Sequence, residues 1–563
     1  MNTRVIFLAK KEKRKVLVAG ALGEDVHVAG IINFLRFAEN EGYKTIFLGP
    51  AVPVEIFIGA IIETDPNLIG VSYRLMPESG EYHLKQFKIA LEEAGLLKAG
   101  KKYIFAGTPQ VANVAKKIEI FDEIFVSTDI EDAITYLRGQ ISSEKTISYP
   151  DNIIDRINWK KPFPVLRHHL GLSTLQETLE AIEKVSKSKV LDVISIAIDQ
   201  DAQENFFHPE KQNPGRKGAG GVPARNTGDF KQLFKASRCG NFPLMRCYQG
   251  TDDLIKMAEM LVKTINNCFA AIPIFWFSKL DGRGPLELEE AIKEHQELMR
   301  WHGERGIPVE VNEPHHFELR ESSDVIAVAD TYLSAYNAKQ MGVKHFICTC
   351  MFDLPMGESF QMDLAKQVAK QEIIKELEDE KFTIYTQTRT GLLRYPSDLD
   401  AAKGRLAASI MMQMALNPEI MHLVSYIEAD HAATADDIIE SCKIARHVIQ
   451  SCIEGIPNML ADPVIQKRKN ELIEEARILL DGIRQIASKE SKDPLSDPIT
   501  LGKAFRIGLL DAPHLKGSSI AKGEIVTKII NGSCYAVDSA GKPLSERDRI
   551  KKILKNILKK DFK

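Results

Sequence analysis

Short apolar runs alternate with amphipathic helical patterns through the first part of the chain. The apolar runs cover residues 15–19, 45–48, 68–72, 102–106 and 123–126. This alternation predicts βαβ units, in which a parallel sheet carries helices on both faces. We therefore predict an α/β, doubly wound (flavodoxin-like) domain over residues 1–140, with its ligand loops at the carboxyl ends of the strands.

A second series of strand-like segments follows a polar stretch, residues 141–160, that we interpret as a linker. Eight such segments cover residues 163–168, 190–199, 242–248, 270–278, 308–312, 345–352, 382–386 and 421–427. Helical patterns separate most of them, which predicts a (β/α)8 barrel of the TIM type over residues 161–450. Residues 451–563 are predicted to form a C-terminal extension, helical at first and with a small β element, that caps the barrel or joins subunits.

The composition excludes several classes of protein. The chain has 563 residues, of which 44% are hydrophobic and 27% are charged, and its formal net charge is −3. Charges of both signs are mixed throughout, so no basic surface typical of nucleic-acid binding is expected. No apolar run has the length of a membrane span, and no signal-peptide pattern opens the chain. Its 8 cysteines form no CxxC motif, so we expect reduced thiols in a cytoplasmic protein without a membrane partner.

The loop after the first predicted strand carries the most informative chemistry. Asp25 stands two residues before His27, so its carboxylate can orient one imidazole nitrogen while the other nitrogen binds a transition metal. Gly30 would let a bulky group approach the backbone. A lone histidine in such a loop is more often structural, but a strand before it and a helical pattern after it favour a metal ligand.

The pattern Asp-x-His-x-x-Gly, followed about forty residues later by Ser72, resembles the cobalamin-binding domain of B12-dependent enzymes. The resemblance implies that His27 ligates cobalt and that the nucleotide tail of the cofactor passes Ser72 and the pair Ala106-Gly107. Two departures are visible, because the Ser-x-Leu of that family reads Ser72-Tyr73-Arg74-Leu75 here and its Gly-Gly pair reads Ala106-Gly107. The implied cofactor-binding residues are Asp25, His27, Gly30, Ser72, Leu75, Ala106 and Gly107.

The barrel region resembles the catalytic subunit of glutamate mutase (methylaspartate mutase). The clearest match is residues 501–513, and weaker matches at 195–199, 242–251 and 306–314 extend the resemblance over most of residues 161–530 at low identity. In that family the cobalamin domain is a separate small subunit, whereas here it would be fused at the N-terminus. The resemblance implies an adenosylcobalamin-dependent carbon-skeleton mutase, which is an isomerase.

The carboxyl-end loops of a barrel hold its chemistry, which selects candidate residues by position. These are Arg167, Asp199, Gln203, Glu204, Arg246, Lys279, Asn312, Glu313, Asp353, Arg389, Glu428 and His431. For each of them, a loop cap or an ion pair is about as plausible as a catalytic role. The basic, glycine-rich loop at 213–221 would either hold an anion or act as a mobile lid.

The resemblance also bears on the substrate, because glutamate mutase clasps a dicarboxylic amino acid with arginines and a glutamate. Arg167 matches one of these arginines, and Arg246 lies near another. The amine-binding glutamate has no counterpart at 270–272, so we expect a small carboxylic acid or acyl substrate rather than glutamate. Glu428 and His431 complete the catalytic set as candidates for contacting the migrating group or the adenosyl ribose.

Two other functions compete with the mutase. A corrinoid-dependent methyltransferase is the alternative, although such proteins usually carry a helical bundle before the cobalamin domain and only about a dozen residues precede the first strand here. A non-catalytic corrinoid carrier or sensor fits poorly with a barrel of this size. We expect a homodimer or a higher homo-oligomer, because barrel mutases of this kind commonly associate through their large domain.

Overall fold

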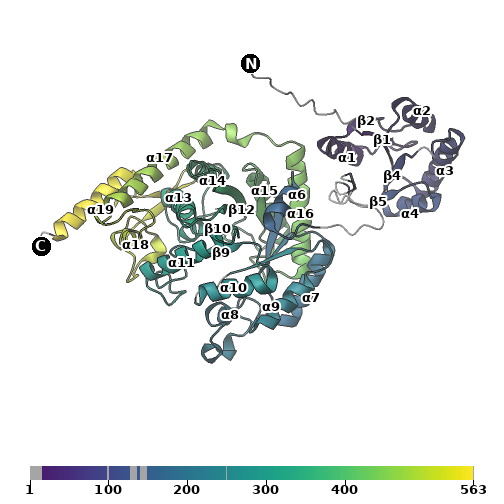
Figure 1. Ribbon diagram of the computed structural model, residues 1–563. Coiled ribbons are helices and arrows are strands. Elements are labelled where there is room, and N and C mark those ends of the chain that lie inside the picture. The colour runs from purple at the N-terminus through teal and green to yellow at the C-terminus, as the bar shows by residue number, and fades with distance from the viewer. Residues whose placement is uncertain are drawn as a thin grey trace, which may run out of the picture. The chain divides into compact units, whose positions relative to one another are not determined.

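The computed structural model describes residues 15–97, 100–126, 133, 136–137, 139, 149–248, 250 and 252–561. The chain divides into two compact units, Met1–Ser148 and Tyr149–Lys563, which are described separately (Figure 1).

The first unit is a five-stranded parallel sheet with the strand order β2-β1-β3-β4-β5. Its strands are β1 (Val16–Ala21), β2 (Lys44–Phe47), β3 (Leu68–Tyr73), β4 (Lys102–Gly107) and β5 (Glu123–Phe125). Its helices are α1 (Ala29–Asn40), α2 (Val54–Thr64), α3 (Pro77–Glu93) and α4 (Pro109–Ile118). This order is that of the flavodoxin-like doubly wound fold, so the predicted fold class is confirmed.

The apolar runs form these strands because both faces of the sheet are covered by helices. All six residues of β3 are buried, as expected for a parallel strand that lies between two layers. The chain reverses its winding direction between β1 and β3, which makes the loops after these two strands the walls of the ligand crevice in such sheets. His27 lies in the first of these loops, and Ser72 lies at the end of β3.

The second unit is built on an eight-stranded parallel barrel with the strand order β8-β7-β6-β13-β12-β11-β10-β9. The strands are β6 (Val165–Leu170), β7 (Val193–Ile196), β8 (Leu244–Cys247), β9 (Ala270–Ile272), β10 (Val309–Val311), β11 (His345–Met351), β12 (Thr383–Arg389) and β13 (Ile420–His422). The helices around them are α7 (Leu175–Ser188), α8 (Gln200–Glu204), α9 (Thr227–Ala236), α10 (Leu254–Ile265), α11 (Leu288–Gly303), α12 (Pro314–Glu318), α13 (Asp324–Gln340), α14 (Phe360–Lys375), α15 (Leu399–Met414) and α16 (Ala435–Glu454). Each of the eight predicted segments contains or overlaps one strand, so the predicted barrel is confirmed.

The barrel closes in two ways. The first strand pairs with the last, since Arg167 of β6 lies opposite His422 of β13. Between β8 and β9, among the described residues, the backbone N–H of Cys268 donates to Met245 O (3.0 Å), and the backbone N–H of Cys247 donates to Asn267 Oδ1 (2.9 Å). The sheet is therefore nearly continuous around its axis.

Several predicted strands are longer than the observed ones. The predicted segment 270–278 forms a strand only over Ala270–Ile272, because the loop that follows is itself buried and apolar. Phe275 and Trp276 in this loop are completely buried. Hydrophobic patterning alone does not separate a buried loop from a buried strand.

Part of the predicted linker is folded onto the barrel. Helix α6 (Ile153–Lys160) is capped by Asn152, whose side chain accepts from the backbone of Asp155 (2.9 Å). Ile153 and Ile157 are buried against the bottom of the barrel. This half of the predicted linker belongs to the second unit, and residues 141–148 lie outside the described residues.

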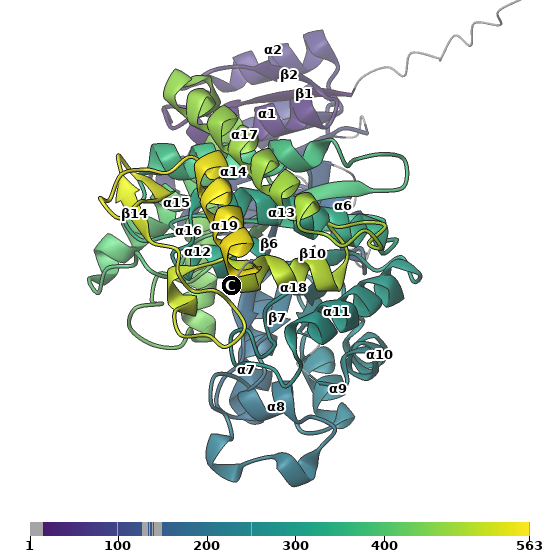
Figure 2. The same cartoon turned by 90° about the vertical axis from the view of Figure 1, so that its left-hand side faces the viewer.

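The C-terminal region packs along one side of the barrel. It contains η3 (Met459–Ala461), α17 (Pro463–Gln485), α18 (Pro498–Ile507), η4 (Pro513–Leu515), the hairpin β14 (Thr527–Ile530) with β15 (Ser533–Ala536), and α19 (Glu546–Asp561). Helix α17 lies across α13 and α14 and beside α19 (Figure 2). Buried Asp324 of α13 accepts from Arg468 of α17 (3.0 Å) and from the backbone of Cys534 in β15 (3.1 Å), which attaches this region to the barrel.

Candidate functional site

The loop after β1 holds His27 in a fixed orientation. Its Nδ1 lies 2.7 Å from Asp25 Oδ1, and its backbone N–H donates to the same oxygen (2.9 Å). The second carboxylate oxygen accepts from the backbone N–H of Arg74 (2.7 Å), in the loop after β3. Asp25 therefore joins the two loops that flank the crevice of the sheet.

The exposure of these two side chains differs sharply. The side chain of Asp25 is 0% exposed, whereas that of His27 is 52% exposed. Because the carboxylate accepts from Nδ1–H, the lone pair of the imidazole is placed on Nε2. Among the described residues, Nε2 meets no hydrogen-bond partner. A ring oriented by a carboxylate, with its other nitrogen free, is the arrangement of a metal-binding histidine.

The predicted glycines play different parts. A Cβ added at Gly30, in the first turn of α1, would meet no atom within 4 Å, so no described neighbour requires glycine there. A Cβ at Gly107 would lie 2.5 Å from Tyr73 O, so packing between β4 and β3 itself requires a glycine at this position. An open backbone at Gly30 fits a bulky ligand, whereas Gly107 is explained by the fold alone.

The remaining predicted cofactor residues line the ends of β3 and β4. Ser72 is 5% exposed, and its carbonyl accepts from the backbone N–H of Leu22 (2.9 Å). Leu75 is half-buried and packs against the core of the first unit. Ala106 is half-buried near the end of β4. The structure brings these residues to the same edge of the sheet as His27.

A second polar cluster, which the sequence did not predict, supports the His27 loop. The hydroxyl of Tyr73 donates to Glu24 Oε1 (2.7 Å) and lies 2.6 Å from Ser79 Oγ. His83 pairs with the other oxygen of Glu24. Gly23 adopts a positive φ of 63°, and a Cβ there would lie 2.7 Å from the ring of His83. Tyr73 and His83 thus hold the loop that carries His27 through their contacts with Glu24.

Glu310 of β10 is the centre of the polar network inside the barrel. Its Oε2 accepts from Arg167 Nη1 (3.0 Å) and Arg246 Nη2 (2.9 Å). Its Oε1 accepts from Thr349 Oγ1 (2.8 Å) and Gln387 Nε2 (2.9 Å). Burial opposes its ionisation, but the two arginines outweigh this effect and hold the pKa of Glu310 at about 2.

The arginines of the barrel differ in how well they are paired. Arg167 also donates to Ser195 Oγ (2.7 Å) and to Gln387 Oε1 (2.7 Å), so most of its donors are used. Arg246 is completely buried, yet its Nε and Nη1 meet no partner among the described residues, and the same is true of Arg389 Nε. Buried donors without acceptors are rare, because each costs about 1–3 kcal/mol. Arg246 and Arg389 are therefore the part of the network that an anion would complete.

Four histidines surround these arginines. His169 and His422 are stacked, with ring centroids 4.7 Å apart and an angle of 11° between the rings. His315 and His316 lie in α12, directly after β10, with centroids 4.4 Å apart. Burial and the nearby positive charges lower the pKa of all four well below 6.5, so they are neutral at pH 7.

Glu313, a candidate from the sequence, faces the buried loop after β9. One oxygen accepts from the backbone N–H groups of Phe275 and Trp276, the latter at 3.3 Å, and the other meets no partner among the described residues. Burial raises its pKa to about 8, which favours the protonated form of the carboxyl group. Asn312 next to it also has an unpartnered Oδ1 within the described residues.

The two predicted catalytic residues after β13 lie in different surroundings. Glu428 is exposed and close enough to Arg389 for their charges to interact, which associates it with the arginine network. His431 is exposed and lies 2.7 Å from Asp430 Oδ2 and 3.2 Å from Asp437 Oδ2, close to the start of α16. These contacts raise the pKa of His431 and fit the ion-pair alternative to its predicted catalytic role.

The other candidate loop residues are held mainly by local contacts. Asp199 caps α8 and pairs with Arg225 (2.5 Å). Lys279 pairs with Glu287 at the surface (2.6 Å), and buried Asp353 pairs with Arg405. These contacts fit the alternative of a loop cap or an ion pair.

The basic loop at 213–221 packs against α8 and the residue that caps it. Arg216 donates to Glu204 Oε2 (3.0 Å) and to Gln200 Oε1 (3.2 Å), both in α8. The backbone N–H of Gly218 donates to Asp199 Oδ2 (2.9 Å). Acidic side chains thus neutralise Arg216, which disfavours the anion-binding alternative for this loop.

Buried histidines make the stability of the barrel depend on pH. Burial lowers the pKa of His168, His295 and His302 to about 4, whereas the unfolded chain binds these protons near pH 6.5. The contribution of these neutral histidines to the free energy of unfolding is therefore complete above pH 6.5 and decreases as the pH falls toward 4. Urea unfolding at pH 7 and at pH 5 measures this decrease in the free energy of unfolding. We expect the decrease to be about 1–3 kcal/mol smaller in H302Q than in the parent protein. Replacement of exposed His447 by glutamine is the control and should leave the loss unchanged; an equal loss in H302Q and the parent would contradict the assignment.

Within the part of the chain that the structure describes, no helix combines the length and the apolar character needed to span a bilayer.

Fold and sites together define a two-unit α/β protein, with an oriented histidine at the crevice of a doubly wound sheet and a buried arginine network in a barrel. No family model matches the chain. Among curated proteins it is similar to the glutamate mutase sigma subunit of Clostridium cochlearium, with 32% identity over 84 residues, 15% of this chain and 60% of that protein. The chain thus spans less than two thirds of the length of this relative.

Two solved structures show weaker similarity. One is a cobalamin-binding protein from Desulfitobacterium hafniense DCB-2, with 27% identity over 23% of this chain and 61% of that chain, and a TM-score of 0.21. The other is the cobalamin-dependent S-adenosylmethionine radical enzyme OxsB, with 10% identity over 88% of this chain and 73% of that chain, and a TM-score of 0.20. At these TM-scores neither similarity bears on the function of this chain.

Proposed function

We propose that this protein is an adenosylcobalamin-dependent isomerase that rearranges the carbon skeleton of a small carboxylic acid or acyl compound. The observation that carries the proposal is His27, oriented by Asp25 at the crevice of the sheet (Nδ1 to Oδ1, 2.7 Å). The similarity to a glutamate mutase subunit supports the same class of reaction.

The residues around His27 fit a cobalt corrinoid. An imidazole with a free Nε2 is a suitable ligand, and its carboxylate partner fixes the orientation of the ring. Gly30 leaves the first turn of α1 uncovered, where a Cβ would meet no atom within 4 Å. When bound, adenosylcobalamin supplies a carbon-centred radical that abstracts hydrogen from the substrate. Asp25 and the backbone of Arg74 hold the ligand ring in place throughout.

The charges in the barrel support the proposed class of substrate. Arg167 and Arg246 pair with Glu310, and Arg389 interacts electrostatically with Glu310 and Glu428, so three cations meet two carboxylates and the network carries an excess of positive charge. A substrate carboxylate that accepts from Arg246 Nε or Nη1 and from Arg389 Nε would pair these donors through charge-assisted hydrogen bonds. The neutral histidines add polar groups without opposing an anion.

The network of arginines around Glu310 also disfavours an amino acid as the substrate. Both oxygens of Glu310 already accept two hydrogen bonds each, so this carboxylate has no free site for a substrate ammonium group. An ammonium group beside the arginines would also be repelled by like charge. We therefore propose a carboxylic acid or acyl substrate without an amine.

The experiment is anaerobic electron paramagnetic resonance of the protein with adenosylcobalamin, frozen after mixing with a panel of mono- and dicarboxylic acids, their thioesters and their amino analogues. We expect a cobalt-coupled organic radical with an amine-free acid or thioester, and no such signal with glutamate. R246M should lose the signal at the same substrate concentration, and K279M, which changes an exposed lysine of another barrel loop, should retain it. If no substrate elicits a radical while methylcobalamin is demethylated by a thiol or amine acceptor, the protein is a corrinoid methyltransferase instead.

A further inference from the structure

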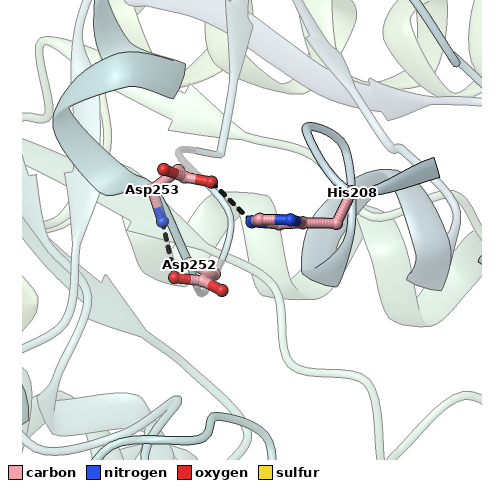
Figure 3. A group of neighbouring side chains, drawn as sticks. All are labelled: His208, Asp252 and Asp253. Atoms are coloured by element: carbon pink, nitrogen blue, oxygen red, sulfur yellow. Dashed lines mark hydrogen bonds and ion pairs between the residues drawn. The ribbon is translucent and has the colours of Figure 1, made fainter. Parts of the chain in front are cut away.

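We propose that His208, Asp252 and Asp253 bind a divalent transition-metal ion, Mn²⁺ or Zn²⁺, that joins two neighbouring loops of the barrel. His208 directly precedes η1 (Pro209–Lys211) in the segment after β7, and the two aspartates directly precede α10 after β8. Figure 3 shows the imidazole edge pointing toward the carboxylate of Asp253, with Asp252 beside it. One ligand atom from each residue lies within 4.8 Å of the others.

The distances suit a small cation. His208 Nε2 lies 3.0 Å from Asp253 Oδ2, and two ligands on a tetrahedral ion with bonds of about 2.1 Å lie about 3.4 Å apart. A shift of a few tenths of an ångström therefore admits the ion. Asp252 Oδ1 accepts from the backbone N–H of Asp253 (2.9 Å), which orients its carboxylate. One imidazole and two carboxylates form a mixed nitrogen and oxygen set that suits Mn²⁺ or Zn²⁺ better than Mg²⁺ or Ca²⁺.

A second observation separates this cluster from an ordinary group of surface carboxylates. His208 Nδ1 lies 3.2 Å from Glu210 Oε1, so a carboxylate holds the ring nitrogen opposite the proposed ligand atom. Metal-binding histidines are held in this way almost without exception. The arrangement repeats, at a separate place in the chain, the relation between Asp25 and His27.

The size of the cavity and the charge of the cluster also fit a divalent cation. The three side chains line a cavity of about 10 Å³, which is walled by Phe206, Phe207 and Met257 and has the size of one water molecule or one ion. Lys256 lies 3.9 Å from Asp253 Oδ1 but is exposed, so it offsets only part of the negative charge of the two aspartates. A divalent cation would complete the neutralisation.

The location gives the ion a role. Tyr248, the residue that follows β8, lies against the guanidinium of Arg246 (4.8 Å from its ring centroid) and against the ring of His169 (5.8 Å between centroids). Asp252 and Asp253 stand at the start of α10, so an ion there would join the start of α10 to the segment that holds His208. This inference goes beyond the isomerase proposal and does not depend on it.

The test is calorimetric titration of the chelator-treated, full-length protein with Mn²⁺ alone, without cobalamin, together with the Mn²⁺ paramagnetic resonance signal. We expect one site per chain that Zn²⁺ competes for and Mg²⁺ does not. D252N and H208Q should each weaken binding more than tenfold, and E210Q should weaken it about 10- to 100-fold. E259Q removes one negative charge from an exposed position of the same helix and should bind as the parent does.

Each other outcome overturns the site. Absence of saturable Mn²⁺ binding, or binding that D252N and H208Q leave unchanged, excludes these residues as ligands. Equal weakening in E259Q shows that general negative charge, rather than the three side chains, attracts the ion. Because Asp252 is exposed, D252N should stay folded, and circular dichroism checks this for each variant.

Discussion

Replacing Glu310 with glutamine is expected to lower the free energy of unfolding of the barrel unit by about 3–5 kcal/mol, because breaking a buried ion pair leaves its partners uncompensated. In E310Q, Arg167 and Arg246 lose their shared counter-ion while both stay buried. All 3 tryptophans of the chain lie in the barrel unit, so tryptophan fluorescence during urea unfolding measures this unit separately from the first.

The controls for E310Q separate the buried network from an ordinary surface pair. E297Q removes an exposed carboxylate that pairs with exposed Arg300 (2.6 Å) and should cost less than about 1 kcal/mol. The double variant E310Q/R246M removes a cation together with the carboxylate and should recover part of the loss. The network would lack the proposed importance if E310Q cost no more than E297Q.

The same residue predicts a defined pH dependence. The pKa of Glu310 is lowered in the folded protein from 4.5 to about 2, so its stabilising effect is complete above pH 4.5 and disappears as the pH falls toward 2. The difference in stability between the parent and E310Q should therefore be constant from pH 7 to pH 5 and become smaller below that range.

Replacing His27 with alanine is expected to remove nitrogen ligation of cobalt and to lower turnover by about 100-fold or more, since loss of an orienting partner alone costs 10- to 100-fold. We expect the ring nitrogen of His27 to split the cobalt resonance in the parent protein, and this splitting should be absent in H27A. D25N keeps the ligand but weakens its orientation, so we expect about 10- to 100-fold weaker cofactor binding with the splitting retained.

His83 provides the matched control for His27. It lies in the same unit and pairs with Glu24, next to Asp25 in the chain, but it is not a proposed ligand. H83Q should keep the nitrogen splitting and most of the activity. Retention of the splitting in H27A, or its loss in H83Q, would assign the cobalt ligand to a different residue.

The sequence by itself determined the strands and the contact between Asp25 and His27 in the loop after β1. Apolar runs such as Leu68–Tyr73 are local signals, because a strand covered on both faces must be apolar along its whole length. Asp25 and His27 are two positions apart, so a short loop was enough to bring them into contact (2.7 Å). These features depend on neighbouring residues, and pattern and spacing therefore predict them.

Only the tertiary structure decided which groups meet inside the barrel. Arg167, Glu310 and Gln387 come from three strands far apart in the sequence, and the partners of each depend on the register of the whole sheet. For the same reason the stacked pair His169 and His422 had no local signal. The basic loop at 213–221 had a clear local pattern, but this pattern did not reveal that α8 supplies acidic partners to Arg216. Residue type and position on a strand are local properties, whereas charge pairing in a buried network is set by elements that the chain brings together only on folding.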